Sequence, residues 1–204
     1  MQVSTVLTLA FDTATPRSSC ALLAGEELLG ERETKAVSVL GAADGLLAEG
    51  GFSARDLDRI VCGTGPGSFT GIRIGLAAAR GLALALGLPL GGVSTLAALR
   101  EGAPGSLPVI DGSRKEIFTL VDGVPAVARP ENLTLPAGAL CVGDGAVRYR
   151  AVLEAAGAEV PPDASELHSV RARFHARLAG EFGPAELVQP LYLRIPDAEK
   201  ALER

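Results

Sequence analysis

Residues 70–86, with the sequence TGIRIGLAAARGLALAL, predict a helix that is apolar around nearly its whole circumference. Arg73 and Arg80 are its two charged side chains. A helix that is apolar on every side must be covered on every side. We expect one face to pack on the chain's own sheet. A lobe of about 100 residues rarely encloses a helix completely, so the other face favours a partner.

Gly71, Gly75 and Ala79 recur every four residues in this helix and form a smooth stripe along one side. Small side chains let two helices approach closely. We therefore expect the stripe to face a helix of a second subunit. The predicted partner interface consists of Gly71, Arg73, Gly75, Ala78, Ala79, Leu82, Val37 and Leu40.

A glycine-rich loop, GTGPGSFTGIRIG at 63–75, leads into the helix. It lacks the Gly-Lys-Ser/Thr ending of a P-loop, and its glycines do not have the spacing of a dinucleotide fingerprint. Backbone N–H groups at 68–71 would suit an anion at the start of a helix. The alternative is a tight turn that needs the backbone freedom of glycine. We favour a turn that starts the helix.

Composition restricts the functional classes. Apolar residues make up 48% of the chain, charged residues 21%, and the formal net charge is −5, as in a globular protein with weak intrinsic affinity for nucleic acid. The first residues lack a basic segment and soon reach Asp12, so we expect no signal peptide. The uncharged stretch 81–99 is broken by Gly87 and Pro89, which predicts two buried elements rather than a membrane span. We expect a cytoplasmic protein.

The order of predicted elements indicates an α/β fold. The first half predicts strands at 6–13 and twice within 20–34, a helix at 35–49, a strand at 57–63, the helix at 70–86, a strand at 88–94 and a helix at 94–100. This is the order of one RNase H-like lobe. The second half predicts strands at 107–112, 116–123 and 139–145 and a helix at 165–182. We expect an N-terminal lobe of residues 1–102 and a smaller second lobe of residues 103–204, with the C-terminal helix and tail.

Residue types that bind metals are sparse. His168 and His175 lie seven apart on the helix predicted at 165–182, about 10 Å along its axis, too far to share one ion. We expect both at the surface or its edge. Cys20, Cys62 and Cys141 are widely spaced, as reduced structural thiols are. We expect no metal site, and no protease nucleophile motif such as Gly-x-Ser-x-Gly occurs.

Residues 63–96, GTGPGSFTGIRIGLAAARGLALALGLPLGGVSTL, resemble the signature of the bacterial TsaB family, also called YeaZ. LAFDTATPRSSCAL at 9–22, DGSRKEIF at 111–118 and QPLYLR at 189–194 are similar to its opening hairpin, second-lobe motif and tail. The resemblance implies a two-lobed, actin-like and RNase H-like α/β fold with a reduced second lobe.

The chain departs from the family pattern at two places. Lys35-Ala36 replaces the His-Ser or His-Thr pair that usually opens the first helix. Of the family's Asp-Ala-Arg-x-Gly-Glu motif, Asp111, Arg114 and Glu116 match.

The resemblance also implies a function. It implies a non-catalytic accessory subunit for threonylcarbamoyl transfer to adenosine 37 of tRNA, which pairs with the catalytic TsaD subunit and recruits the TsaE ATPase. The protein alone would form a homodimer, and it would meet tRNA only through the complex. Two other functions stay open, namely an actin-like ATPase or small-molecule kinase and a structural homodimer without an enzymatic partner. The glycoprotease activity in the family's older label is not supported by the motifs.

An ATPase would need a nucleotide cleft between the lobes. The candidate residues stand where actin-like ATPases place their phosphate and adenosine loops: Asp12, Thr13, Asp111, Gly143 and Gly145. Pro16 and Arg17 follow the first pair, and the loop at Asp111 lacks a run of glycines. We therefore expect an empty, degenerate cleft and no cofactor, with ATP bound only weakly or at the interface of a complex.

Overall fold

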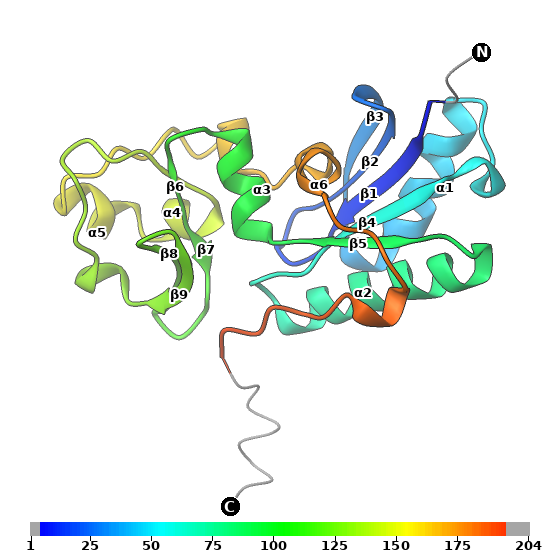
Figure 1. Cartoon of the computed structure of the whole chain (residues 1–204). Helices are drawn as coiled ribbons and strands as arrows, with labels where there is room; N and C mark the ends of the chain where they lie inside the picture. Colours follow the sequence, from blue (N-terminus) through cyan, green and yellow to red (C-terminus); the bar gives the residue numbers. More distant parts are fainter. Residues whose placement is uncertain (1–4, 195–204) are drawn as a thin grey trace, which may run out of the picture.

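A five-stranded mixed sheet forms the centre of the first lobe in the computed structural model, which describes residues 5–194. Its order is β3-β2-β1-β4-β5, with antiparallel pairs β1–β2 and β2–β3 and parallel pairs β1–β4 and β4–β5. The two-lobed α/β arrangement confirms the predicted fold class (Figure 1). The strands are β1 (Leu7–Asp12), β2 (Ser18–Ala24), β3 (Glu27–Thr34), β4 (Arg59–Gly63) and β5 (Leu90–Val93).

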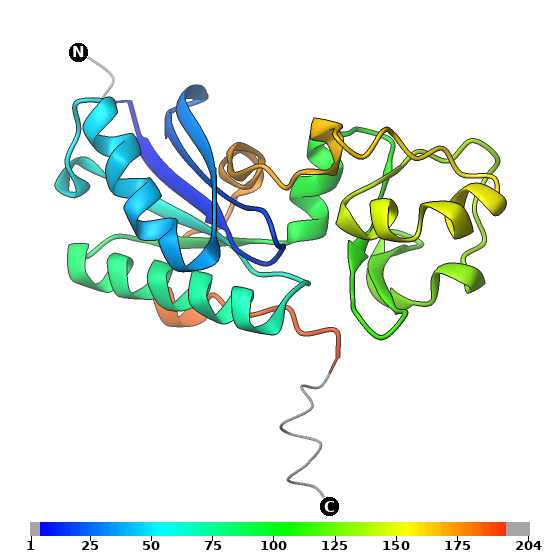
Figure 2. The same ribbon diagram turned by 180° about the vertical axis from the view of Figure 1, so that it is seen from behind.

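Helices cover both faces of this sheet. Side chains of β1 alternate between the faces, so Leu9 and Phe11 pack toward α1 and α2, while Ala10 packs toward α6. Figure 2 shows α1 and α2 in front of the sheet and α6 behind it. The small side chains Ala10 and Ala21 let α6 approach the sheet closely. The helical segments are η1 (Ala36–Ser38), α1 (Val39–Glu49), η2 (Ala54–Asp56), α2 (Phe69–Leu86) and α6 (Ala172–Leu178).

The second lobe contains two small sheets. One is antiparallel with order β7-β8-β9, and the other is a parallel pair of β6 and β10. The strand predicted at 107–112 is in fact two strands in different sheets, because the chain changes sheet at Val109. Leu153 and Ile117 fill the core between the sheets and the helices. The elements are β6 (Leu107–Pro108), β7 (Ile110–Asp111), β8 (Ile117–Val121), β9 (Val124–Ala128), η3 (Pro130–Asn132), β10 (Cys141–Val142), α4 (Asp144–Arg148), α5 (Arg150–Ala155) and η4 (Glu166–His168).

α3 (Thr95–Gly102) lies between the lobes (Figure 1). Leu96 and Leu99 on this helix share one apolar cluster with Ile110 and Phe118 of the second lobe. The predicted boundary after Gly102 coincides with the end of α3. The packing of α3 nevertheless joins it to both sides of that boundary.

The C-terminal part of the chain differs from the prediction. The helix expected at 165–182 is interrupted between η4 and α6, where Ser169 and Arg171 have extended backbones. α6 packs on β1 and β2, and η5 (Ala185–Leu187) packs on α2. Placing the C-terminal helix in the second lobe was therefore wrong, whereas the tail contacts both lobes up to Arg194 and its residues 195–204 lie outside the described part of the chain. The physical reason is that the sheet of the first lobe has a second apolar face, which α6 covers.

Candidate functional site

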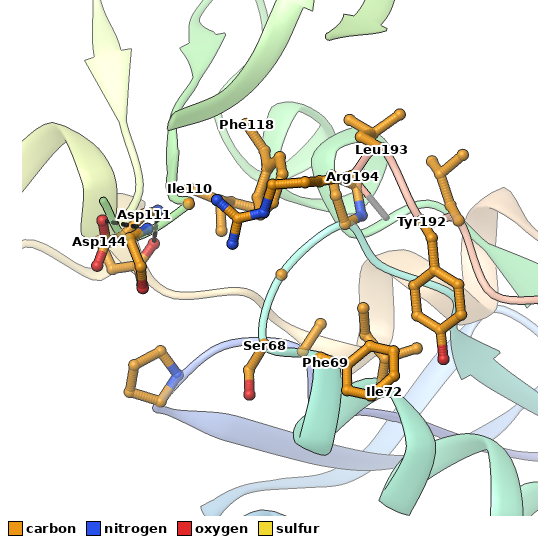
Figure 3. Close-up of a pocket in the computed structure, with 17 residues that line it drawn as sticks. Ser68, Phe69, Ile72, Ile110, Asp111, Phe118, Asp144, Tyr192, Leu193 and Arg194 are labelled. Carbon is orange, nitrogen blue, oxygen red and sulfur yellow. Dashed lines mark hydrogen bonds between the residues drawn. The ribbon is translucent and has the colours of Figure 1, made fainter. Parts of the chain in front are cut away.

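A cleft of about 450 Å³ lies between the lobes. Ile72 and Phe69 line it from the first lobe, Ile110 and Phe118 from the second, and Tyr192 from the C-terminal segment. Figure 3 shows the carboxylates of Asp111 and Asp144 on one side of this cleft and the side chains of Ile72 and Tyr192 on the other. The walls are apolar, and the polar groups belong mainly to the second lobe.

Asp12, predicted as a nucleotide-cleft residue, does not line the cleft. The alternation along β1 turns its side chain toward α6, where it is 1% exposed. Asp12 Oδ1 accepts a hydrogen bond from the backbone N–H of Ala14 (2.7 Å), and Oδ2 accepts one from the Thr95 hydroxyl (2.7 Å). His175 Nε2 lies 2.9 Å from the same Oδ2.

The surroundings of Asp12 favour its charged form. Burial raises the pKa of this carboxyl, but the contacts with His175, Thr95 and the Ala14 amide lower it by more, so the pKa of Asp12 lies below its ordinary value. Both carboxylate oxygens are occupied by partners within the protein. Asp12 thus holds α3 and α6 on the first lobe instead of facing a ligand.

Thr13 is also buried outside the cleft, contrary to the prediction. Its hydroxyl donates a hydrogen bond to the carbonyl of Gly71 in α2 (2.7 Å). The loop before α2 is engaged in a similar way. The N–H of Ser68 donates to the carbonyl of Ala14, and the N–H of Gly71 donates to the side chain of Ser68. The loop is therefore a turn that starts the helix, as predicted, and two of the four amides at 68–71 have partners within the chain.

On the second lobe, Asp111 does line the cleft, as predicted. Arg148 Nη1 lies 2.6 Å from its Oδ2, and the N–H of Ser113 donates to its Oδ1. The sequence reasoning missed Asp144 as a cleft residue. Its Oδ1 accepts from the N–H groups of Asp111 and Gly145, and burial raises the pKa of Asp144 to about 6. The sequence offered one indication of this position, because Asp144 lies between Gly143 and Gly145, which were both predicted to be cleft residues.

Gly143 and Gly145 do not line the cleft, so their placement as cleft residues was wrong. Gly143 has φ +112°, and a Cβ there would lie 2.2 Å from the carbonyl oxygen of Val109. Its N–H donates to Nδ1 of His168 (3.1 Å). Glycine is required here for close backbone packing, which explains the motif without a phosphate.

The small-residue stripe of α2 faces inward, so its assignment to a partner interface was wrong. Gly71, Gly75 and Ala79 are buried against the first lobe. A Cβ on Gly71 would lie 2.1 Å from the Thr13 carbonyl oxygen, and one on Gly75 would lie 2.2 Å from the Thr13 hydroxyl. The close approach that the stripe predicts is made by the turn after β1.

The other predicted interface residues lie at or near the outward side of the lobe. Val37 and Leu40 are exposed, as is Arg73, while Ala78 and Leu82 are half-buried at the edge of the core. The outward face of α2 also carries residues that the prediction omitted: Ala77, Gly81, Leu84 and Ala85. Leu84 is 83% exposed. η1 lies against α2, so both segments contribute to one surface.

α2 is also the one helix of residues 5–194 that is long and apolar enough to cross a membrane. Length and composition are weak evidence, because the core helices of soluble proteins meet the same criteria. One face of α2 is packed on the sheet of the first lobe.

The two histidines are both buried, so their expected surface position was wrong. His175 lies between α6 and the sheet beside Asp12, and His168 accepts the N–H of Gly143. All three cysteines are buried, and burial raises the pKa of Cys20 and Cys62 to about 12 and that of Cys141 to about 11. Within residues 5–194, no group of three or more His, Cys, Asp or Glu side chains is arranged to hold a metal ion.

Comparison with known proteins identifies the family. The profile of TsaD, tRNA N6-adenosine threonylcarbamoyltransferase, matches residues 33–131. An uncharacterized protein of Mycobacterium tuberculosis is 37% identical over 214 aligned residues, which cover 98% of this chain and 96% of the relative. The crystal structure of a Pseudomonas aeruginosa protein, described as similar to the peptidase YeaZ, superposes with a TM-score of 0.73 at 30% identity, and covers 93% of this chain and 100% of that one. The chain belongs to the TsaB (YeaZ) family.

Within the TsaB family, the tRNA threonylcarbamoyladenosine biosynthesis protein TsaB of Escherichia coli is 43% identical over 101 residues. These residues are 47% of this chain and 43% of the E. coli protein. The resemblance noted in the sequence is thereby confirmed.

Proposed function

We propose that this TsaB-family chain is a non-catalytic accessory subunit in the biosynthesis of tRNA threonylcarbamoyladenosine. In this proposal a TsaD-like subunit carries out threonylcarbamoyl transfer to adenosine, and the chain keeps that subunit competent. The main support for this proposal is the position of Asp12, which is buried against His175 and Thr95 and so does not face a ligand. The outward face of α2, in contrast, is exposed.

The cleft does not fit a magnesium–nucleotide complex. In actin-like ATPases a carboxylate orders Mg²⁺ or water, and glycine turns bring backbone amides to the phosphates. Here both oxygens of Asp12 have partners within the protein. Arg194 lines the cleft and pairs with Glu116, and Arg148 pairs with the cleft residue Asp111, so each faces a carboxylate before it could face a phosphate. We therefore propose that the chain has no cofactor of its own and that ATP acts at most at the interface of a complex.

The outward face of α2, together with Val37 and Leu40 near the start of α1, is the proposed docking surface for the TsaD-like subunit. It is apolar and exposed, and a second helix could approach it closely at Gly81, which has no side chain, and at Ala77, which has only a methyl group. The same face would form a homodimer when the chain is alone. A TsaE-like ATPase would join the pair, tRNA would be met only through the assembly, and the assembly would act in the cytoplasm.

Reconstitution tests the proposal. We expect the purified chain to restore threonylcarbamoyladenosine formation when it is mixed with the TsaD-like and TsaE-like proteins of its own host, and to show no ATP hydrolysis alone. Leu84→Asp should abolish both co-elution with the TsaD-like protein and product formation, because it places a charge on the docking surface. Val124→Asp, at an exposed valine of the second lobe, is the matched control. Product formation without this chain would refute the accessory role.

A further inference from the structure

Residues 188–194, which we call the strap, cross from the first lobe to the second along the cleft. Figure 1 shows this part of the C-terminal segment leaving η5 near α2 and running toward the second lobe. The first-lobe end is fixed by backbone contacts. The carbonyl of Val188 accepts from Arg80 Nη2 (2.5 Å), and the N–H of Leu191 donates to the carbonyl of Thr64 (2.8 Å).

An aromatic cluster at the start of α2 adds to this anchor. The ring of Tyr192 lies 5.1 Å from that of Phe69, centroid to centroid. Arg73 places its guanidinium carbon 3.7 Å from the centroid of Phe69 and donates from Nε to the Tyr192 hydroxyl (3.2 Å). A guanidinium over an aromatic face is attracted by the ring electrons. Residues up to Tyr192 are therefore held on the first lobe.

The next two residues are held by the second lobe. Leu193 packs on the apolar cluster that contains Ile110 and Phe118. Arg194 Nη1 lies 2.8 Å from Glu116 Oε2, and both side chains are mostly shielded, with exposed fractions of 28% and 29%. Shielding protects this ion pair from screening by salt. Figure 3 shows Leu193 and Arg194 on the cleft side of the strap, with Arg194 extending toward Asp111.

The other two crossings between the lobes lie on the opposite side of the molecule. The chain passes from α3 to β6 and returns from η4 to α6, and both passages are at the top of Figure 1, while the strap is at the bottom. Two neighbouring crossings on one side can act as a hinge, because few residues need to change conformation there. A third tie on the far side resists opening about that hinge.

We propose that the strap locks the two lobes at a fixed angle and that release of its second-lobe end lets the cleft open. The lock does not depend on the proposed function, because its contacts lie within one chain. Leu193 and Arg194 form the releasable end, and Tyr192 forms the fixed end.

The test measures the distance between the lobes. Spin labels at Ala48→Cys on α1 and Ala155→Cys on α5 are exposed, and the three native cysteines are buried, so labelling is selective. With the strap intact, double electron–electron resonance should give one narrow distance distribution. The double change Leu193→Asp with Arg194→Ala should broaden the distribution and shift it to a longer mean distance. Leu187→Asp with Arg17→Ala, an exposed leucine before the strap and an ion pair within the first lobe, should leave it unchanged.

A charge exchange keeps the test decisive if the released variant folds poorly. Arg194→Glu alone should open the lobes by repelling Glu116. Adding Glu116→Arg restores an ion pair of reversed direction and should return the narrow distribution. The proposal is overturned if folded Arg194→Glu and Leu193→Asp variants keep the distribution of the intact strap, or if the reversed pair fails to restore it.

Discussion

The two faces of α2 carry the same kind of residue and have opposite surroundings. Gly71, Gly75 and Ala79 repeat every four residues on the inward face, and Ala77, Gly81 and Ala85 repeat every four residues on the outward face. The inward glycines would place a Cβ within 2.2 Å of Thr13, whereas a Cβ on Gly81 would have no neighbour within 4 Å. A stripe of small residues thus indicates that another segment packs closely on the helix, but it does not reveal which segment that is.

The two acidic residues Asp12 and Asp144 form a similar contrast. Asp12 is buried beside an imidazole, and its pKa is lowered. Asp144 is half-buried at the cleft, where backbone amides donate to it, and its partial burial raises its pKa to about 6. Burial penalises the charge of both carboxylates, but the partners of Asp12 outweigh this penalty and those of Asp144 do not.

His175→Ala should cost about 3–5 kcal/mol of unfolding free energy at pH 7, because it leaves the Asp12 carboxylate buried without its imidazole partner. Because the pKa of Asp12 is below its ordinary value in the folded state, its ionised carboxylate stabilises the wild-type protein at neutral pH. This stabilisation is lost as the pH falls through the folded pKa of Asp12. In His175→Ala, burial without the imidazole raises the pKa of Asp12. The difference in unfolding free energy between the variant and the wild type should therefore shrink as the pH falls. Urea unfolding between about pH 2 and 7 measures both effects, because the folded pKa of Asp12 lies below 3.8. Arg177→Ala, at an exposed residue of α6, should change stability by less than about 0.5 kcal/mol.

Gly75→Leu should destabilise the protein by about 1–3 kcal/mol, because its side chain would have to displace the turn at Thr13. Thermal melting followed by circular dichroism measures the loss. The folded fraction should still bind a TsaD-like partner, since the inward face is not the docking surface. An unchanged melting temperature together with lost pairing would instead restore the inward stripe as the interface.

Asp144→Asn should stabilise the protein at pH 7 by about 1–2 kcal/mol. The folded pKa of about 6 exceeds the ordinary value of 3.8, so the folded state binds more protons between these values, and wild-type stability falls as the pH rises from about 4 to 6. The advantage of the amide should therefore vanish below about pH 4. Asp44→Asn on α1 is the control in the same melts. An equal gain at pH 3.5 and pH 7 would exclude the charge as the cause.

Gly81→Leu should leave stability nearly unchanged or raise it by up to about 1 kcal/mol, because leucine is the better helix former and its Cβ meets no neighbour. On the docking surface, however, the side chain would keep a partner helix at a distance and forfeit its packing. Analytical ultracentrifugation, alone and with the TsaD-like protein, should show loss of pairing. Pairing at wild-type strength would move the interface away from α2.

The periodic signals of the first lobe predicted its elements well. Strands at 6–13 and 57–63 and the helix at 70–86 form close to the expected positions. Continuous apolar runs bounded by glycine leave few alternatives for such segments. The second lobe was harder, since strands of two residues, such as β6, β7 and β10, are too short to have a period. The helix at 165–182 failed because its apolar spacing continues through Ser169, where the backbone is extended.

The candidate site was less predictable from the sequence, because its decisive contacts join distant residues. Asp12 meets His175 across 163 positions of sequence. Nothing near either residue reveals the other, so Asp12 resembled a ligand-binding acid and His175 a surface histidine. Asp111 was placed correctly because it ends a strand at the cleft, where loops commonly carry binding groups.

The packing of α6 on the first sheet has a consequence for synthesis of the chain. The sheet is complete once β5 has been made, but the residues that cover its second face are translated only after the whole second lobe. Until then Leu23, Val61 and Val93 form an uncovered apolar surface on the nascent protein. Such surfaces recruit chaperones or aggregate. The second lobe is thus an insertion within the first. A chain truncated before Ala172 lacks α6 and cannot cover the second apolar face of its sheet.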